Sequence, residues 1–248
     1  MVSVSVRAAR RPRSYIRVVG PDAEDFLQRM LSNDVTQAEV VDALLLTPKS
    51  RLIAPLRVWR RGPQDFLLLT EPELGEGVRA QLLRSRFAAK CEIELEEHSS
   101  TLVFGDGDGI PGELPGTVEV LDAAVEPTLS DEEVERARIE AGVPAWGKEL
   151  DDSILPAEAG LDETHISFTK GCYPGQEPIA RLHYRGHVNR RLRAVEVEAA
   201  EPGAEIVYGG KAVGRVTSAV PGRALGYVRV EVPDDAELSV GGAPARLH

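Results

Sequence analysis

Short apolar runs separated by turn residues dominate the first hundred positions of the chain. Arg13–Val19, Val41–Thr47, Leu52–Trp59 and Phe66–Thr70 have the length and spacing of antiparallel strands. After Asp22, apolar side chains recur at the spacing of one helix face. This mixture of strands and amphipathic helix predicts an α+β body, because each apolar face must be buried against another element.

Two further helices are indicated by capping-box pairs. Thr70 with Glu73 predicts a helix whose apolar face carries Leu74, Val78, Leu82 and Phe87. Ser130 with Glu133 predicts a second helix, which has acids in its first turn and ends before Gly142.

Cys91 lies in a different pattern. It alternates with glutamates on a strand that also carries Ile93 and Leu95, so its side chain is expected to point into the core.

The composition changes near residue 188. Short strands are expected at 192–197, 205–208, 212–219, 224–232 and 238–240, and Gly209-Gly210 suits a two-residue hairpin loop. Five strands in some sixty residues predict a small barrel or sandwich. The expected division is therefore an α+β region at 1–187 and a β domain at 188–248.

Charge is distributed unevenly along the 248 residues. The net charge is −11 and the pI is about 5.0, which argues against a protein that coats nucleic acid. Residues 91–163 contain 21 acidic against three basic residues, whereas residues 170–193 contain six basic residues and one acid. The basic segment could focus an anionic ligand, or it could pair with the acidic middle of the chain.

Composition also bears on the compartment. The chain contains two cysteines and has no apolar run long enough for a membrane span. The N-terminal residues lack the apolar core of a secretory signal. A cytoplasmic protein without a membrane partner is expected.

Residues 170–181 contain the strongest chemical signal. Cys172 lies in a turn rich in glycine and proline, two positions after Lys170, where nearby positive charge would favour a reactive thiolate. His165, His183 and His187 are candidate bases for a nucleophilic cysteine. The alternatives are a zinc site of Cys172, His183 and His187, which we do not predict, and a cysteine that only holds the turn.

Several motifs, in the same order along the chain, resemble those of the folate-binding YgfZ family, whose relatives include the aminomethyltransferase (T-protein) of the glycine cleavage system. These motifs are Phe26-Leu27-Gln28 with Ser32-Asn33-Asp34-Val35-Thr36, Arg138-Ile139-Glu140-Ala141-Gly142, Leu155 to Leu161, Lys170-Gly171-Cys172-Tyr173 with Gly175-Gln176-Glu177, and Ala224 to Val228. The resemblance implies an aminomethyltransferase-like α+β fold. In it, two interleaved α+β lobes bind folate and an antiparallel β-barrel follows at the C-terminus.

The resemblance also implies a cofactor, tetrahydrofolate or a derivative. Glu140 matches the carboxylate that grips the pterin ring, and a carboxylate can accept two parallel hydrogen bonds from the pterin. Cys172 is the candidate catalytic residue. The implied cofactor-binding residues are Asn33, Asp34, Arg138, Glu140, Lys170, Tyr173, Gln176, Glu177 and Arg181.

The family further implies a role in iron–sulfur cluster assembly or repair, and through iron–sulfur enzymes in tRNA modification. Iron–sulfur proteins are therefore the expected partners. The ligand could be a polyglutamylated folate, whose anionic tail would suit Arg181, Arg185 and Arg190.

One departure from the aminomethyltransferase pattern limits the expected chemistry. Ala54-Pro55 stands where those enzymes have an acid close to the reacting folate nitrogen, and no nearby side chain in the sequence replaces it. Aminomethyl transfer is therefore not expected, although a folate-dependent aminomethyltransferase remains the alternative enzyme. An RNA or protein adaptor without catalysis is the alternative binding function. RNA is not expected, because aromatic content is only 5% and no RNA-binding motif is present.

Overall fold

The computed structural model describes residues 6–248 and divides the chain into two compact units. The first comprises Met1–Thr128, described from residue 6 onward, and Asp162–Arg185; the second comprises Leu129–Leu161 and Gly186–His248. Each unit is therefore assembled from two separate chain segments. The region 1–187 that the sequence groups together contributes to both units.

The described part of the first unit contains two sheets, three α-helices and a short 3-10 helix. Its strands are β1 (Arg7–Arg10), β2 (Ser14–Val19), β3 (Val40–Leu46), β4 (Leu52–Gly62), β5 (Asp65–Thr70), β6 (Glu92–Glu96), β7 (Ser100–Phe104), β8 (Ile110–Pro111) and β9 (Thr117–Leu121). Its helices are α1 (Ala23–Met30), the 3-10 helix Pro72–Leu74, α2 (Gly75–Ser85) and α4 (Gln176–Arg185).

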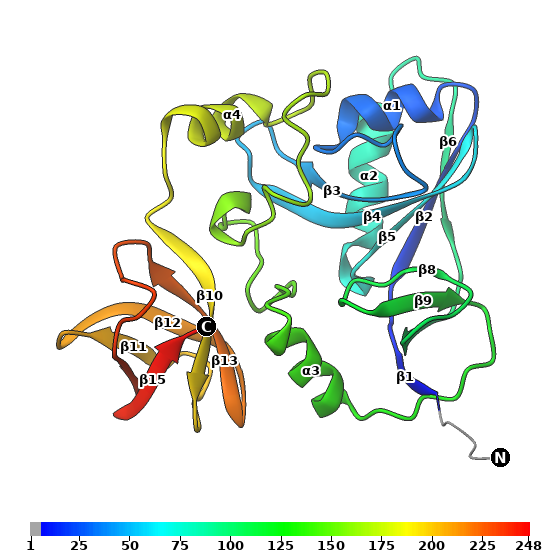
Figure 1. Ribbon diagram of the computed structural model, residues 1–248. Coiled ribbons are helices and arrows are strands. Elements are labelled where there is room, and N and C mark those ends of the chain that lie inside the picture. The colour runs from blue at the N-terminus through cyan, green and yellow to red at the C-terminus, as the bar shows by residue number, and fades with distance from the viewer. Residues whose placement is uncertain (1–5) are drawn as a thin grey trace. The chain divides into compact units, whose positions relative to one another are not determined.

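The larger sheet is antiparallel and has the strand order β3-β4-β5-β2-β6. Helices α1 and α2 pack on one of its faces (Figure 1). Alternation along β3 and β4 directs Ala43, Leu45, Ala54 and Leu56 into the core beneath these helices. The intervening residues of both strands consequently face the other side of the sheet.

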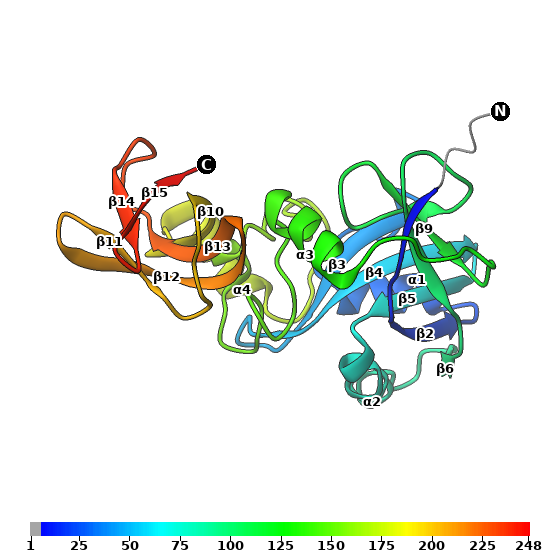
Figure 2. The same ribbon diagram turned by 90° about the horizontal axis from the view of Figure 1, so that it is seen from below.

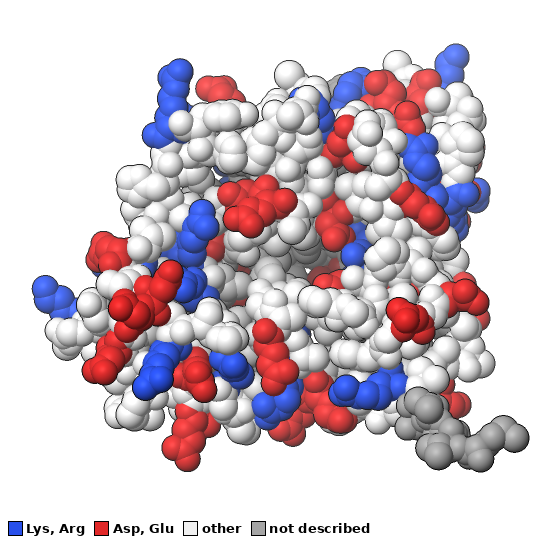
Figure 3. Space-filling view, in the orientation of Figure 1, with Lys and Arg blue, Asp and Glu red and all other residues white. Residues whose placement is uncertain are grey.

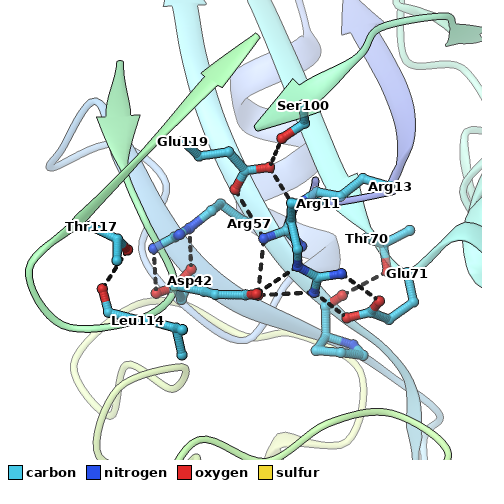
Figure 4. Close-up of polar contacts among 12 residues, drawn as sticks. Arg11, Arg13, Asp42, Arg57, Thr70, Glu71, Ser100, Leu114, Thr117 and Glu119 are labelled. Atoms are coloured by element: carbon cyan, nitrogen blue, oxygen red, sulfur yellow. Dashed lines mark hydrogen bonds and ion pairs between the residues drawn. The ribbon is translucent and has the colours of Figure 1, made fainter. Parts of the chain in front are cut away.

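The second sheet, in the order β1-β7-β9-β8, carries a buried ion network (Figure 4). Arg13 Nε lies 2.6 Å from Glu119 Oε1, and these side chains are 5% and 0% exposed. Arg11 forms bidentate contacts with both Glu71 and Glu113. Burial raises the pKa of Glu113, but Arg13 and Arg11 outweigh it and bring the pKa to about 2. These N-terminal arginines therefore pair with acids inside the first unit.

The second unit combines α3 (Asp131–Glu140), the 3-10 helix Pro156–Glu158 and a closed barrel of order β10-β13-β12-β11-β14-β15. The barrel strands, grouped together in Figure 2, are β10 (Arg190–Val197), β11 (Glu205–Tyr208), β12 (Lys211–Val220), β13 (Gly222–Arg229), β14 (Leu238–Val240) and β15 (Ala243–Leu247).

Pairing of β10 with both β13 and β15 closes the barrel. The strand β15 is absent from the sequence-based prediction, because Pro244 and the glycines before it indicate a turn. The hairpin at Gly209-Gly210 is confirmed, since both residues have the positive φ, 56° and 78°, of a two-residue loop.

The capping-box prediction for α2 is wrong. Thr70 does not cap the helix; its hydroxyl donates to the Pro55 carbonyl, and α2 begins at Gly75 after the 3-10 turn. Phe87 lies beyond the helix end, with φ of 45° and 92% of its surface exposed. The capping box of Ser130 and Glu133 on α3 is confirmed.

Candidate functional site

Residues 162–175 include the turn around Cys172 (residues 170–175, the cysteine turn). Hydrogen bonds hold this segment to the loop that follows α1. Ser32 donates to the His165 carbonyl (Oγ–O 2.6 Å), and the Ser167 amide donates to the Ser32 carbonyl (3.0 Å). Lys170 Nζ donates to the carbonyls of Leu31 and Asn33, each at 2.7 Å. The helix exit and the cysteine turn are thus held together by hydrogen bonds.

The other end of the turn is fixed against the β3–β4 loop. Gly175 has φ of +83°, and a Cβ placed there would lie 2.6 Å from the Thr47 carbonyl oxygen. Ser50 is buried, has φ of 61°, and donates to the Gly175 carbonyl at 2.6 Å. Only glycine satisfies both the backbone angle and this close approach. The Gly of the signature is therefore required by the fold.

Replacing Gly175 with alanine is expected to destabilise the first unit by at least about 2 kcal/mol. The positive φ alone costs about 1–2 kcal/mol, and the contact with the Thr47 carbonyl adds overpacking. Urea denaturation followed by Trp59 fluorescence in a Trp146→Phe background would measure this, because the chain has two tryptophans. Gly171→Ala is the matched control, since no atom lies within 4 Å of its added Cβ. Equal stability of the two variants would contradict the assigned role.

Asn33 and Asp34 use their side chains within the loop after α1. Asn33 Nδ2 donates to the carbonyls of Asp42 (2.8 Å) and Thr164 (3.0 Å). Asp34 Oδ1 accepts from the Thr36 hydroxyl (2.6 Å) and the Thr36 amide (3.0 Å). The Thr36 hydroxyl is the main reason that the pKa of Asp34 lies below its ordinary value. Both residues therefore shape the loop.

Cys172 is exposed at the centre of the turn, whereas Lys170 is partly buried and Tyr173 is buried. Burial lowers the pKa of Lys170 to about 8, although Asp34 opposes this shift. Tyr173 is buried with a pKa raised to about 12, and its hydroxyl has no partner among the described residues. Cys91 is buried in the core beneath α1 and α2, as predicted, and burial raises its pKa.

Helix α4 begins at Gln176, immediately after the turn. Glu177 and Arg181 are exposed on it, and Gln176 is partly buried. The His183 ring stacks on Phe168 with 3.8 Å between ring centroids. Within residues 6–248, no group of three or more His, Cys, Asp or Glu side chains is arranged to hold a metal ion.

Arg138 and Glu140 of the second unit differ sharply in their surroundings. Arg138 is buried; its guanidinium donates to Glu135, to Glu149 Oε2 at 2.8 Å and to Ser218 Oγ at 2.8 Å. Glu140 ends α3 with 51% of its side chain exposed, and Arg136 is 3.8 Å away. The Arg-x-Glu-x-Gly motif thus combines an internal anchor with an accessible carboxylate.

The basic segment that follows the turn is partly neutralised. Arg190 pairs with both oxygens of Glu158 at 3.0 and 3.3 Å, and Arg193 pairs with Asp234 at 2.8 Å. On the face seen in Figure 3, acidic and basic side chains are interspersed. Arg181 and Arg185 are exposed on α4. Arg190 and Arg193 are therefore paired with acids, as Arg11 and Arg13 are.

A polar group that the sequence reasoning missed lies on the sheet face opposite α1 and α2. Asp42 of β3 stands directly across from Arg57 of β4, and Arg57 Nε lies 3.0 Å from Asp42 Oδ1 (Figure 4). Pro55, which occupies the position expected for an acid, points to the same face two residues before Arg57. A carboxylate of the neighbouring strand, that of Asp42, therefore lies on the same face as Pro55 and is paired with Arg57. The sequence contains one signal for this pair: Asp42 and Arg57 are the single charged residues of the apolar runs Val41–Thr47 and Leu52–Trp59.

Known proteins resemble this chain in sequence and in fold. Residues 189–248 match the family described as the CAF17 C-terminal beta-barrel domain. An uncharacterized protein of Haemophilus influenzae is 30% identical over 244 residues, covering 90% of this chain and 87% of that protein. The tRNA-modifying protein YgfZ of Hamiltonella defensa is 27% identical, covering 71% of this chain and 65% of that protein.

Two further similarities extend the comparison. The mitochondrial iron–sulfur cluster assembly factor IBA57 homologue of Mycosarcoma maydis is 28% identical over 73% of this chain and 54% of its own length. Aminomethyltransferase T of the glycine cleavage system from Bartonella henselae has a TM-score of 0.80 at 18% identity, covering 98% of this chain and 85% of that one. This last likeness concerns the fold.

The extent of these matches differs among the relatives. The chain spans most of the Haemophilus protein, but less than two thirds of the YgfZ and IBA57 relatives named above. None of the helices in the described part of the chain is long and apolar enough to cross a membrane. The barrel match, the full-length relative and the aminomethyltransferase fold together show that the chain belongs to the YgfZ family of the aminomethyltransferase-like (GcvT-like) superfamily.

Proposed function

We propose that this chain binds tetrahydrofolate or a derivative and supports iron–sulfur cluster assembly or repair. The observation that carries the proposal is the cysteine turn, in which Cys172 is exposed while Lys170 and Gly175 are fixed in two loops of the first unit. A reactive group needs an accessible position on a rigid support, and this turn provides both. The similarity to an iron–sulfur cluster assembly factor and to a tRNA-modifying protein supports the iron–sulfur role and an indirect effect on tRNA modification.

The folate part of the proposal assigns different tasks to the predicted cofactor residues. Four of these residues form hydrogen bonds within the protein through their side chains: Asn33, Asp34, Arg138 and Lys170. We therefore assign them a structural role in holding loops and helix ends. Glu140, Glu177 and Arg181 are exposed and free to meet a ligand at their surface. Glu140 would accept a hydrogen bond from the pterin amino group, and Arg181 would attract a glutamate tail.

Aminomethyl transfer is not part of the proposal. The similarity to the Bartonella enzyme concerns the fold. On β4 of this chain, Pro55 stands where an aminomethyltransferase is expected to have an acid. Iron–sulfur proteins are the inferred partners, because a relative is an iron–sulfur cluster assembly factor. The two free thiols suit a reducing compartment such as the cytoplasm.

Glu140→Gln is expected to weaken tetrahydrofolate binding more than tenfold. A hydrogen bond to a charged group contributes about 1.5–3 kcal/mol, which corresponds to roughly 10- to 100-fold in affinity. Isothermal titration calorimetry under anaerobic conditions would measure the loss. Glu132→Gln, at an exposed position of the same helix, is the matched control and should bind as the unmodified protein does.

Two results would count against this assignment. Unchanged affinity in Glu140→Gln would remove Glu140 from the pterin site, and absence of tetrahydrofolate binding by the unmodified protein would overturn the folate proposal itself. Following the bound one-carbon folate by absorbance with candidate acceptors would then separate a transferase from a protein that only binds the cofactor.

A further inference from the structure

Asp42 and Arg57 form an isolated polar pair in an otherwise apolar part of the sheet. They face away from α1 and α2, and their same-face neighbours include Leu44, Pro55 and Leu69. The Arg57 side chain is 9% exposed and that of Asp42 is 35% exposed. The pair is therefore open to a ligand on the Asp42 side and buried on the Arg57 side.

Arg57 retains hydrogen-bonding capacity that the protein does not use. Its Nε and Nη2 donate to the two oxygens of Asp42, at 3.0 and 3.3 Å. Its Nη1 is buried and has no hydrogen-bond partner in the described part of the chain. A buried donor without an acceptor is costly, and such groups commonly mark the place of a ligand or an ordered water.

His165 lies beside this pair. Asn33 Nδ2 donates to both the Asp42 and the Thr164 carbonyls, which brings residues 164–165 next to β3. Thr164 Oγ1 is 2.7 Å from His165 Nδ1, so Nε2 is the ring nitrogen left for a ligand. Burial lowers the pKa of His165 and Arg57 lowers it further, whereas Asp42 raises it; the net direction is downward, which favours the uncharged ring.

The charges of this group restrict the ligand that it can take. Asp42 compensates Arg57, and the neutral imidazole adds no charge, so the three side chains sum to zero. A carboxylate or phosphate would bring an uncompensated charge into a mostly buried place. The remaining capacity includes the two N–H bonds of Arg57 Nη1 and the unused lone pairs of the Asp42 carboxylate, which together match a carbonyl and an N–H on one edge of a ligand.

We propose that Arg57 and Asp42, with His165 beside them, form a subsite that binds a neutral amide or lactam group. The carbonyl oxygen would accept from Arg57 Nη1, and the adjacent N–H would donate to the Asp42 carboxylate. This subsite rests on the proposed folate function. A folate has this arrangement in its pterin ring, where the ring holds the C=O and the N–H on one edge, whereas the amide between its benzoyl and glutamate parts is trans and directs the two groups to opposite sides.

Calorimetry with three probes tests the subsite and its source. The probes are tetrahydrofolate, 6-methyltetrahydropterin as the ring alone and 4-aminobenzoyl-glutamate as the amide alone. Arg57→Lys keeps a cation beside Asp42 but removes Nη1, the nitrogen that would donate to the ligand. This variant is expected to weaken tetrahydrofolate binding more than tenfold. It should also weaken the one fragment that occupies the subsite and leave the other unchanged. Arg60→Lys, on the same strand, is the matched control.

Two further variants, Asp42→Asn and Glu140→Gln, distinguish failure of the subsite from failure of the proposed function. Asp42→Asn replaces one acceptor oxygen with an amide donor and should weaken the same fragment; it decides the matter if Arg57→Lys does not fold. Unchanged tetrahydrofolate affinity in both variants, with weakened binding in Glu140→Gln, would overturn the subsite and leave the proposed function standing. Failure of the unmodified protein to bind tetrahydrofolate would overturn both.

Discussion

In the native protein, Cys172 is expected to react with iodoacetamide on the order of a thousandfold faster than Cys91. Cys172 is exposed, so its reaction needs no opening of the fold. Cys91 is 5% exposed, and burial raises its pKa, which lowers the thiolate fraction at any given pH. If Cys91 reacts only after an opening that costs about 5 kcal/mol, its rate falls by more than a factor of 10³.

Peptide mass mapping over time would report both alkylation rates. In concentrated urea the two rates should converge, which controls for intrinsic differences between the two peptides. Equal rates in the native protein, or no labelling of Cys172 before unfolding, would remove the functional interpretation of Cys172. That cysteine would then be a residue that holds the turn.

Arg138→Met is expected to destabilise the second unit by about 3–5 kcal/mol. The substitution leaves the carboxylate of Glu149, which is 0% exposed, without its cationic partner, and breaking a buried ion pair from one side typically has this cost. It also removes the donors to Glu135 and the Val143 carbonyl. The expected loss is therefore much larger than that of an exposed pair.

Trp146 fluorescence in a Trp59→Phe background would follow unfolding of the second unit, which contains Trp146. Arg136→Met is the control, because Arg136 lies on the same helix with 37% of its side chain exposed. It should lose no more than about 1 kcal/mol. If both variants unfold at the same urea concentration, Arg138 is not the anchor of α3.

Together, Arg138 and Glu140 show why a motif does not reveal the task of each member. Both residues belong to Arg-x-Glu-x-Gly, and the sequence places both among the cofactor residues. In the structure, the Arg138 guanidinium donates hydrogen bonds to Glu135, Glu149 and Ser218. Glu140, in contrast, ends α3 with an exposed carboxylate. The partners of Arg138 are 3, 11 and 80 positions away along the chain, and no local pattern predicts the most distant of them.

The cysteine turn was the part of the candidate site that local sequence predicted best. Its glycine-rich composition indicates tight backbone bends, and the positive φ of Gly175 agrees with that. The anchors of the turn, Leu31, Thr47 and Ser50, lie more than a hundred positions earlier. Asp42 and Arg57 were not predicted for a related reason: each is the single charged residue of an apolar run, and only strand register brings them together.

By itself, the sequence determined the strands of the first sheet, the capped start of α3, the hairpin at Gly209-Gly210 and the inward position of Cys91. These follow from side-chain alternation, helix capping and turn chemistry, which act over a few neighbouring residues. Tertiary structure alone decided that β15 closes the barrel, that residues 129–161 group with it, and that Arg57 keeps an unpaired donor. Such outcomes depend on pairing and burial between segments far apart in the chain, where local preferences carry no information.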